Sequence, residues 1–293
     1  MFKCALICTD FDDSLQRLVK FVPDLVQSGL DQVVFFHNVL LKPEREIPKV
    51  DDAAIDQAKR ALGEANEATL SDGKSVVIDV RTGLVIDNIS KSARCYDADV
   101  LLLGTPTRSL LTEKIFGSTT TGIAKQLNIP LVILRPQLVS TYRKEELALR
   151  CQNLFTHLLV PYDGSNSAKY LVSQIVAAAK TNHYPKQCTL CWVIDECIRV
   201  ELRESEEQVQ AKLDEVSAEL EAVGVDVSTE IRQGDPQPEI LKSAEINDIS
   251  AIAICSGKSK GILKWSVPSF TSALLRSSWH PVIHFPGQNQ ASR

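Results

Sequence analysis

The sequence contains two copies of one pattern, and this internal repeat constrains the possible fold more than any other feature. The run CALICTDFDDS corresponds to HLLVPYDGSNS, VIDVRTG corresponds to VSTEIRQG, and IPLVIL corresponds to HPVIHF. Because chance matches do not keep nearly the same spacing over most of a chain, we expect a duplication. The aligned landmarks are Asp10 with Asp163 at an offset of 153, and Gly83 with Gly234 and Pro130 with Pro281 at an offset of 151.

Each copy alternates apolar runs with amphipathic stretches. Runs rich in Val, Ile and Leu without alternation are typical of strands that are covered on both faces. Strands separated by helices need crossover connections, which give a mainly parallel sheet. We therefore predict an α/β fold of two tandem doubly wound sheets, each five-stranded and mainly parallel, with helices on both faces. In the first copy we expect strands at 3–9, 32–39, 75–80, 99–103 and 130–135, and helices near 14–27, 52–70, 85–95 and 118–127.

The length of 293 residues also favours two domains, at roughly 100 to 200 residues for each. The repeat assigns residues 1–138 to the first domain and 153–287 to the second. Between them, residues 137–152 are polar and charged, which is typical of a linker.

Composition excludes several functional classes. With 32 basic and 37 acidic side chains the net charge is −5, so we expect no nucleic-acid partner. No apolar run approaches the roughly 18 residues of a membrane helix, and the early acidic residues do not fit a signal peptide, so we expect a cytoplasmic protein without a membrane partner. The eight cysteines are scattered through strand-like runs, and we expect buried thiols rather than structural disulfides.

Ligands of open parallel sheets bind at the carboxyl ends of the strands, so the loops after the first and fourth strands matter most. Asp10 follows the first strand, where it is either an acid that caps a turn or a contact for a ligand. Gly104 ends the fourth strand, and the run from Gly117 to Thr120 opens the next helix. The free amides of such a helix start favour a phosphate, although a glycine followed by an ordinary Ser/Thr cap has the same sequence.

These features together resemble the universal stress protein family in its tandem form. Its nucleotide-binding members carry an Asp at the end of the first strand and a G-x2-G-x9-G-[S/T] loop after the fourth. The loop here departs from that pattern at Thr107, which would either crowd the ribose or the first phosphate with its Cβ or donate a hydrogen bond from its hydroxyl. The resemblance implies an adenine-nucleotide α-hydrolase-like fold that binds ATP, or AMP or ADP, together with Mg. It implies that Cys8 and Asp10 border the base and ribose, that adenine is recognised at Asn38, and that the phosphates are held by Gly104, Thr107, Gly117, Ser118 and Thr119.

The second copy keeps the first part of this pattern and loses the rest. Pro268 stands where the first copy has Gly117, and proline lacks the N–H that a phosphate would need. We therefore expect a degenerate phosphate loop, in which surface lysines either attract another anion or are simply solvated. The corresponding positions in this second, vestigial site are Pro161, Asp163, Val193, Ser256, Lys258 and Ser269.

The resemblance implies a stress-response or regulatory protein whose first domain binds an adenine nucleotide. We expect no dedicated catalytic residues and at most slow ATP hydrolysis, because no general base is evident beside a γ-phosphate. The main alternative is a structural or interaction module of the same fold that binds no nucleotide; an enzyme built on this fold is a third. Family members also pair domains through their last strands, which predicts an intramolecular pseudo-dimer through 130–135 and 281–286, with homodimers of the chain as a further possibility.

Overall fold

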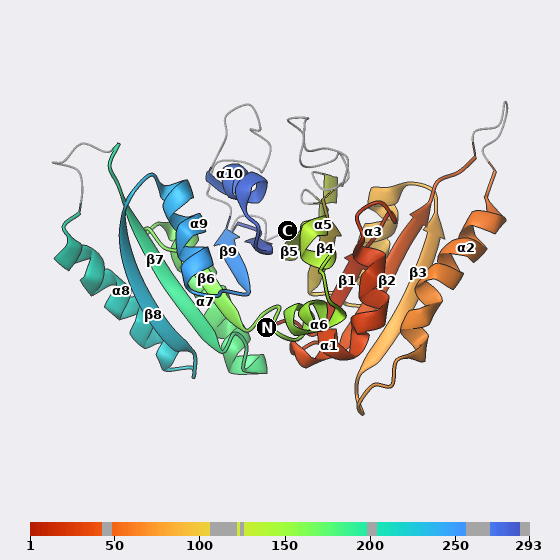
Figure 1. Cartoon of the computed structure of the whole chain (residues 1–293), viewed down its shortest axis with the longest axis horizontal. Coiled ribbons are helices and arrows are strands. Elements are labelled where there is room, and N and C mark those ends of the chain that lie inside the picture. The colour runs from red at the N-terminus through yellow and green to blue at the C-terminus, as the bar shows by residue number, and fades with distance from the viewer. Residues whose placement is uncertain (43–48, 106–121, 124–125, 198–203, 256–269, 288–293) are drawn as a thin grey trace. The chain divides into compact units, whose positions relative to one another are not determined.

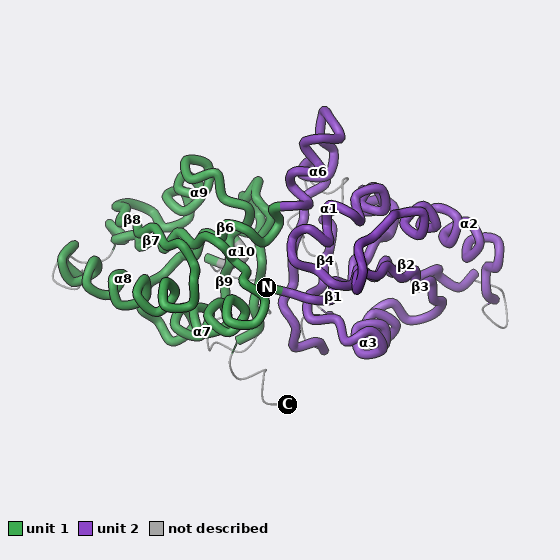
Figure 2. Tube along the Cα trace, turned by 90° about the horizontal axis from the view of Figure 1, so that it is seen from below, with its two compact units in different colours: residues 1, 153–293 green, residues 2–152 purple. Residues whose placement is uncertain are grey.

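The structure is a computed structural model that describes residues 1–42, 49–105, 122–123, 126–197, 204–255 and 270–287. The chain divides into two compact units, which Figure 2 separates by colour. One unit comprises Phe2–Gln152, and the other comprises Asn153–Arg293 together with Met1. We call them the first and the second half. Among the described residues, no helix is long and apolar enough to cross a membrane.

The first half is built on five parallel strands in the order β3-β2-β1-β4-β5 (Figure 1). Figure 2 shows α1 and α2 on one side of this sheet and α3 on the other. The strands are β1 (Cys4–Cys8), β2 (Gln32–Val39), β3 (Ser75–Thr82), β4 (Val100–Gly104) and β5 (Leu131–Leu134). The α-helices are α1 (Val22–Gln27), α2 (Asp52–Gly63), α3 (Val85–Cys95), α5 (Pro136–Val139) and α6 (Lys144–Gln152). Two short 3-10 helices are η1 (Leu15–Phe21) and η2 (Glu64–Glu67).

The second half repeats this design, with strands in the order β10-β9-β6-β7-β8 and parallel pairing throughout. Helix α9 lies on one side of the sheet, and α7 and α8 lie on the other (Figure 2). The strands are β6 (His157–Pro161), β7 (Gln187–Asp195), β8 (Asp226–Gly234), β9 (Ala251–Cys255) and β10 (Val282–Phe285). The helices are α7 (Asn166–Asn182), α8 (Glu206–Glu221), α9 (Pro236–Ile246) and α10 (Phe270–Ser277). The predicted fold class, two tandem parallel α/β units, is confirmed.

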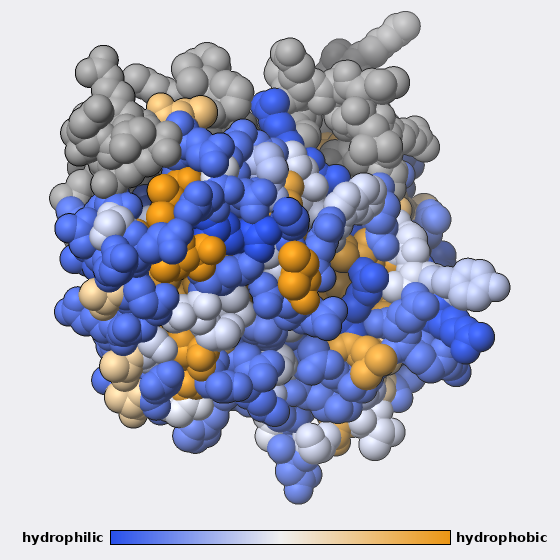
Figure 3. All heavy atoms as spheres, turned by 60° about the vertical axis from the view of Figure 1, so that its left-hand side comes forward, coloured by the Kyte–Doolittle hydropathy of each residue, from blue (hydrophilic) through white to orange (hydrophobic). Residues whose placement is uncertain are grey.

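Burial explains why the strand runs lack alternation. Every residue of β1 is buried, as are Val100–Leu103 of β4 and Ala251–Ile254 of β9, because helices cover both faces of these central strands. The outermost strands β3 and β8 are mostly half-exposed instead. Over the face that Figure 3 shows, hydrophilic side chains cover most of the area and apolar ones form small separate groups. The apolar surface of the sheets is thus buried under the helices.

The duplication is visible in the backbone as well as in the sequence. Four positions with positive φ in the first half have a counterpart with positive φ at the aligned position of the second half. This region is costly for residues other than glycine, so its recurrence reflects a shared set of turns. The pairs are Phe11 and Gly164 (φ 67° and 70°), Gly73 and Gly224 (80° and 84°), Gly83 and Gly234 (110° and 135°), and Asp97 and Asp248 (50° and 49°).

The segment that we expected to be a linker, 137–152, contains helical structure. Helix α6 packs against α1, with Leu147 and Cys151 buried one turn apart. Gln152 Nε2 also donates a hydrogen bond of 2.7 Å to the Asp24 carboxylate on α1. Two apolar residues at a spacing of four are enough to dock an otherwise charged helix, and α6 therefore belongs to the compact first half.

Candidate functional site

In each half the order of the strands reverses beside the first strand of the copy. In the first half, β1 lies between β2 and β4, with Cys8 opposite Phe36 on one side and Leu103 on the other. In the second half, β6 lies between β7 and β9. The chain leaves the two neighbours of such a strand toward opposite faces, so a crevice opens at their carboxyl ends. Both candidate sites are at this edge of the sheet.

The Asp10 side chain shapes the loop that follows β1. Its Oδ1 accepts hydrogen bonds from the backbone N–H groups of Asp12 and Asp13, at 2.9 and 3.1 Å. This is an Asx turn, in which the side chain replaces a backbone acceptor. Asp10 is exposed, so its carboxylate both holds the turn and faces solvent at the carboxyl edge of the sheet.

Asp13, three residues further on, is buried in the same loop. Its Oδ1 accepts hydrogen bonds from the Thr9 hydroxyl, at 2.8 Å, and from the Leu15 N–H, at 2.9 Å. Burial is the largest influence on this carboxyl group and raises its pKa from 3.8 to about 6, against the lowering effect of these hydrogen bonds. A Cβ placed on Gly104 would lie 2.4 Å from the Asp13 Cβ, so the end of β4 is glycine because Asp13 packs on it.

Cys8 and Asn38 stand at the ends of the two neighbouring strands. Cys8 is buried, and desolvation raises the pKa of its thiol well above the usual value, so it is neutral at physiological pH. Asn38 Nδ2 donates to the Gly83 carbonyl at 3.1 Å, and its Oδ1 accepts from Asn88 Nδ2 at 2.8 Å. The Asn38 side chain therefore ties β2 to the turn between β3 and α3.

Four residues that the resemblance assigns to phosphates, Thr107, Gly117, Ser118 and Thr119, lie outside the described residues. The same holds for Ser256, Lys258 and Ser269 of the second half. The described members in the first half, Cys8, Asp10, Asn38 and Gly104, share the carboxyl edge of one sheet.

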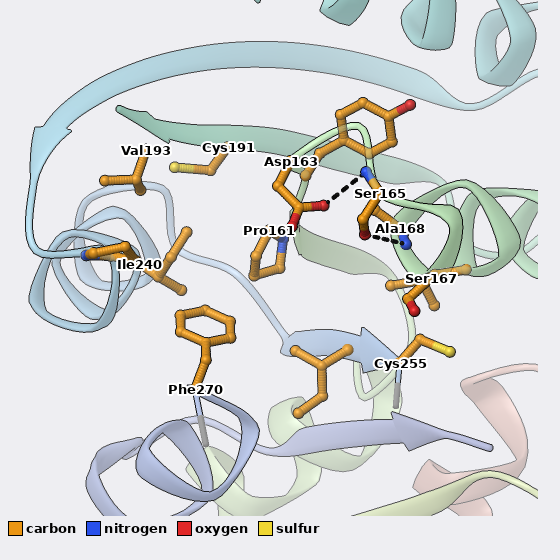
Figure 4. Close-up of a pocket in the computed structure, with 14 residues that line it drawn as sticks. Pro161, Asp163, Ser165, Ser167, Ala168, Cys191, Val193, Ile240, Cys255 and Phe270 are labelled. Carbon is orange, nitrogen blue, oxygen red and sulfur yellow. Dashed lines mark hydrogen bonds between the residues drawn. The ribbon is translucent and has the colours of Figure 1, made fainter. Parts of the chain in front are cut away.

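The second half contains a cavity of about 320 Å³ at the equivalent edge (Figure 4). Pro161, Asp163 and Val193, which the repeat aligns with the first-half site, all line it. Asp163 Oδ1 accepts a hydrogen bond from the Ser165 N–H at 3.0 Å, and the Ser165 hydroxyl caps α7 by accepting from the Ala168 N–H at 3.2 Å. The loop after β6 thus uses an Asx turn, as the loop after β1 does.

Further residues line this cavity that sequence reasoning did not assign to a site. Cys255 is the last residue of β9 and aligns with Gly104, so its position at a strand end is a signal that could have identified it. Ile240 and Phe270 come from α9 and α10, and no local sequence signal marks them. The other newly found lining residues include Ser165, Ser167 and Cys191.

The thiols of this cavity are protonated at physiological pH. Desolvation raises the pKa of Cys191 to about 12 and that of Cys255 to about 11. All eight cysteines lie in the described part of the chain, and they are thiols rather than disulfides. Cys188 and Cys191, the C-x-x-C pair, both lie in the interior of β7. They are therefore not at a helix start, where redox-active pairs have depressed pKa values.

Several solved structures are similar to this chain. A universal stress protein from Archaeoglobus fulgidus DSM 4304 is 19% identical, with 97% of this chain and 98% of that chain covered and a TM-score of 0.67. A functionally unknown protein from Pseudomonas aeruginosa PAO1 is 13% identical, with 99% and 94% covered and a TM-score of 0.56. A universal stress protein in complex with cAMP is 16% identical over 45% of this chain and 96% of that one, with a TM-score of 0.36.

No curated protein matches the sequence. The family model does, and it matches twice. The model described as the universal stress protein family covers residues 1–135 and again 154–286, which together make up most of the chain. Apart from Met1, each match falls within one of the two compact halves. The chain therefore belongs to the universal stress protein family, in the tandem form with two copies of the domain.

Proposed function

We propose that the chain binds an adenine nucleotide, ATP in the first instance, in its first half, and that it acts as a regulatory or stress-responsive protein rather than as a dedicated enzyme. The observation that carries this proposal is the reversal of strand order at β1, where Asp10 and Gly104 lie at the carboxyl ends of two neighbouring strands. A reversal of strand order is where open parallel sheets bind nucleotides. Membership of the family agrees with this assignment.

The described residues suit the nucleoside end of such a ligand. The exposed Asp10 carboxylate offers acceptors to ribose hydroxyls, and the backbone at Asn38 would contact the adenine. The phosphates and Mg would be held by the loop that includes Thr107, Gly117, Ser118 and Thr119. Binding would act by differential affinity, because a ligand shifts a conformational equilibrium only as far as it prefers one state.

The test is the nucleotide that the purified protein retains, identified by mass spectrometry, together with calorimetric titration with Mg-ATP. Asp10→Ala and Gly117→Pro are expected to remove binding, because the first deletes an acceptor at the ribose and the second deletes an N–H at the phosphates. Asp163→Ala, the matched change in the second half, is the control and should leave binding unchanged. Loss of binding in Asp163→Ala alone would place the nucleotide in the second half and contradict the proposal.

A second candidate function is a structural or interaction module that binds no nucleotide. One observation favours it: Asp13 packs on Gly104. This contact explains the glycine without a ligand, and it places a buried carboxyl group at the end of β4, where a phosphate would have to approach. This alternative predicts that wild-type protein carries no nucleotide through purification and shows no change of melting temperature in millimolar Mg-ATP.

A further inference from the structure

The cavity of the second half is large enough for a small organic molecule. Its volume of about 320 Å³ lies at the lower end of ligand pockets, which run from about 300 to 1,000 Å³. It is also about twice the size of an engineered cavity of roughly 150 Å³ that takes benzene. A compact compound of two or three rings is therefore of a suitable size.

The floor and walls of the cavity are built mainly from hydrocarbon. Leu171 of α7, Ile240 of α9 and Ile254 of β9 are almost fully buried around it. Phe270 stands across from Pro161 and Ile240 and is 38% exposed, so its ring borders the opening (Figure 4). An apolar ring that entered this space would be removed from water on most of its surface, which is the dominant favourable contribution in such sites.

Apart from the thiols of Cys191 and Cys255, the polar side chains of the cavity come from the segment that follows β6. Asp163 and Ser165 are exposed, Ser167 is half-buried, and all three come from the loop and first turn that follow β6 (Figure 4). Asp163 brings a carboxylate that accepts but does not donate hydrogen bonds when ionised. None of the described residues that line the cavity is Lys, Arg or His. The segment after β6 therefore favours a ligand with a donor group and disfavours an anion.

The sequence after β9 also disfavours a phosphate, because Pro268 replaces the glycine whose N–H would bind one. The two halves thus share a framework and differ in the character of their crevice.

We propose that the cavity of the second half binds a compact, uncharged ring compound without phosphate, whose N–H or O–H group donates a hydrogen bond to Asp163. The rings contact Ile240, Ile254 and Phe270, and the donor faces the loop after β6. This site is separate from the nucleotide site of the first half, and the assignment does not depend on it.

Two dyes with the same ring skeleton test the proposal on the full chain. N-phenyl-1-naphthylamine is neutral and carries one N–H, whereas 1-anilinonaphthalene-8-sulfonate adds a negative charge. Fluorescence titration of the wild type is expected to show binding of the neutral dye, with the sulfonate at least about tenfold weaker because Asp163 repels it. Equal affinity for the two dyes would overturn the proposal.

Paired variants locate the dye. Ser167→Phe places a ring at the opening of the cavity and is expected to weaken the neutral dye at least tenfold. Asn166→Phe is the matched control, because Asn166 is exposed on the same helical turn and does not line the cavity. Circular dichroism is used to check that both variants fold. Unchanged binding in Ser167→Phe would overturn the assignment.

A second variant tests the charge of Asp163 without adding bulk to the cavity, so it remains informative if Ser167→Phe fails to fold. Asp163→Asn keeps an acceptor at the same place and removes the charge, so the sulfonate should bind the variant several-fold more tightly while the neutral dye changes little. Asp10→Asn in the first half should alter neither. Displacement of the neutral dye by millimolar Mg-ATP would show that the cavity accepts phosphate, and would overturn the proposal.

Discussion

Asp13 lies against Gly104 so closely that a single added carbon at position 104 would fall 2.4 Å from the Asp13 Cβ. The two residues are 91 positions apart in the sequence, and they meet because β1 and β4 are neighbours in the sheet. The contact fixes the loop after β1 against the end of β4. It joins the two elements on which any ligand of the first half would rest.

Gly104→Ala is expected to destabilise the protein by about 1–3 kcal/mol, as overpacking does when the neighbouring atom is not the tip of a flexible side chain. Chemical denaturation measures the change. The control is Gly63→Ala, where no atom lies within 4 Å of the new Cβ and the residue is helical, so stability should stay level or rise by up to about 1 kcal/mol. A Gly104→Ala protein as stable as the wild type would contradict the contact.

The buried Asp13 makes stability depend on pH. Its pKa is about 6 in the folded protein and 3.8 ordinarily, so the folded state binds the proton more tightly. Its contribution to stability is therefore fully present below pH 3.8 and is lost as the pH rises through 6. This difference corresponds to at most about 3 kcal/mol.

Asp13→Asn should remove that dependence and keep the oxygen that accepts from Thr9 and Leu15. We expect the variant to gain stability over the wild type between pH 4.5 and pH 7.5, measured by urea denaturation at each pH. Asp12→Asn, at an exposed position in the same loop, is the control. A stability difference that does not change with pH would show that Asp13 titrates normally.

An acid, an arginine and a buried serine form the same network in each half. In the first, the Arg81 guanidinium contacts both oxygens of Asp79 at 2.9 Å, and the Ser92 hydroxyl donates to Asp79 at 2.6 Å. In the second, Glu230 pairs with Arg232 and accepts from Ser243. The members align at the offset of 151, so the network is part of the duplicated framework.

Ser92→Ala should cost about 1.5–3 kcal/mol, the usual value of a hydrogen bond to a charged group, and Ser243→Ala should cost a similar amount. The unfolding transition followed by denaturant measures both. Ser217→Ala is the control, because that hydroxyl contacts a carboxylate on an exposed helix face and should cost less than about 0.5 kcal/mol. Equal effects of all three changes would show that burial of the network adds nothing.

The exposed residues Asp97 and Asp248 provide a matched pair for backbone strain. Both have φ near 50°, a region in which glycine is at least as comfortable as any other residue. Asp97→Gly and Asp248→Gly are each expected to change stability by only a few tenths of a kcal/mol. Asp97→Val and Asp248→Val should each lose more than about 1 kcal/mol, because a branched Cβ clashes there. Thermal melting of the four variants checks this, and a tolerated valine at either position would contradict the assigned conformation.

The framework was predictable from the sequence because it rests on regular, local signals. Apolar runs such as 32–39 and 99–103 carry the strands, and the structure has β2 and β4 there. Because the second copy aligns with the first, the elements of the second half could be predicted from those of the first. Helix α6 was missed because its apolar stripe consists of only two buried residues, Leu147 and Cys151, in a charged segment.

The walls of the site were less predictable, since they depend on which distant elements meet. Asp163 and Val193 could be named because one follows β6 and the other lies near the carboxyl end of β7, and the sheet gathers these ends at one edge. Ile240 and Phe270 line the same cavity from two different helices and are 30 positions apart, and no sequence spacing predicts that they come together. The burial of Asp13 likewise depends on β4, so a run of three acids gave no sign of which one is enclosed.

The turns shared by the two halves have a practical consequence. Phe11 and Gly164 differ in nearly every property of a side chain, yet the backbone beneath them has φ values within 3° of one another, 67° and 70°. A loop cut from one half should therefore keep its shape when grafted into the other. At this turn the two halves serve as references for one another, because the same backbone conformation is formed by two different residues.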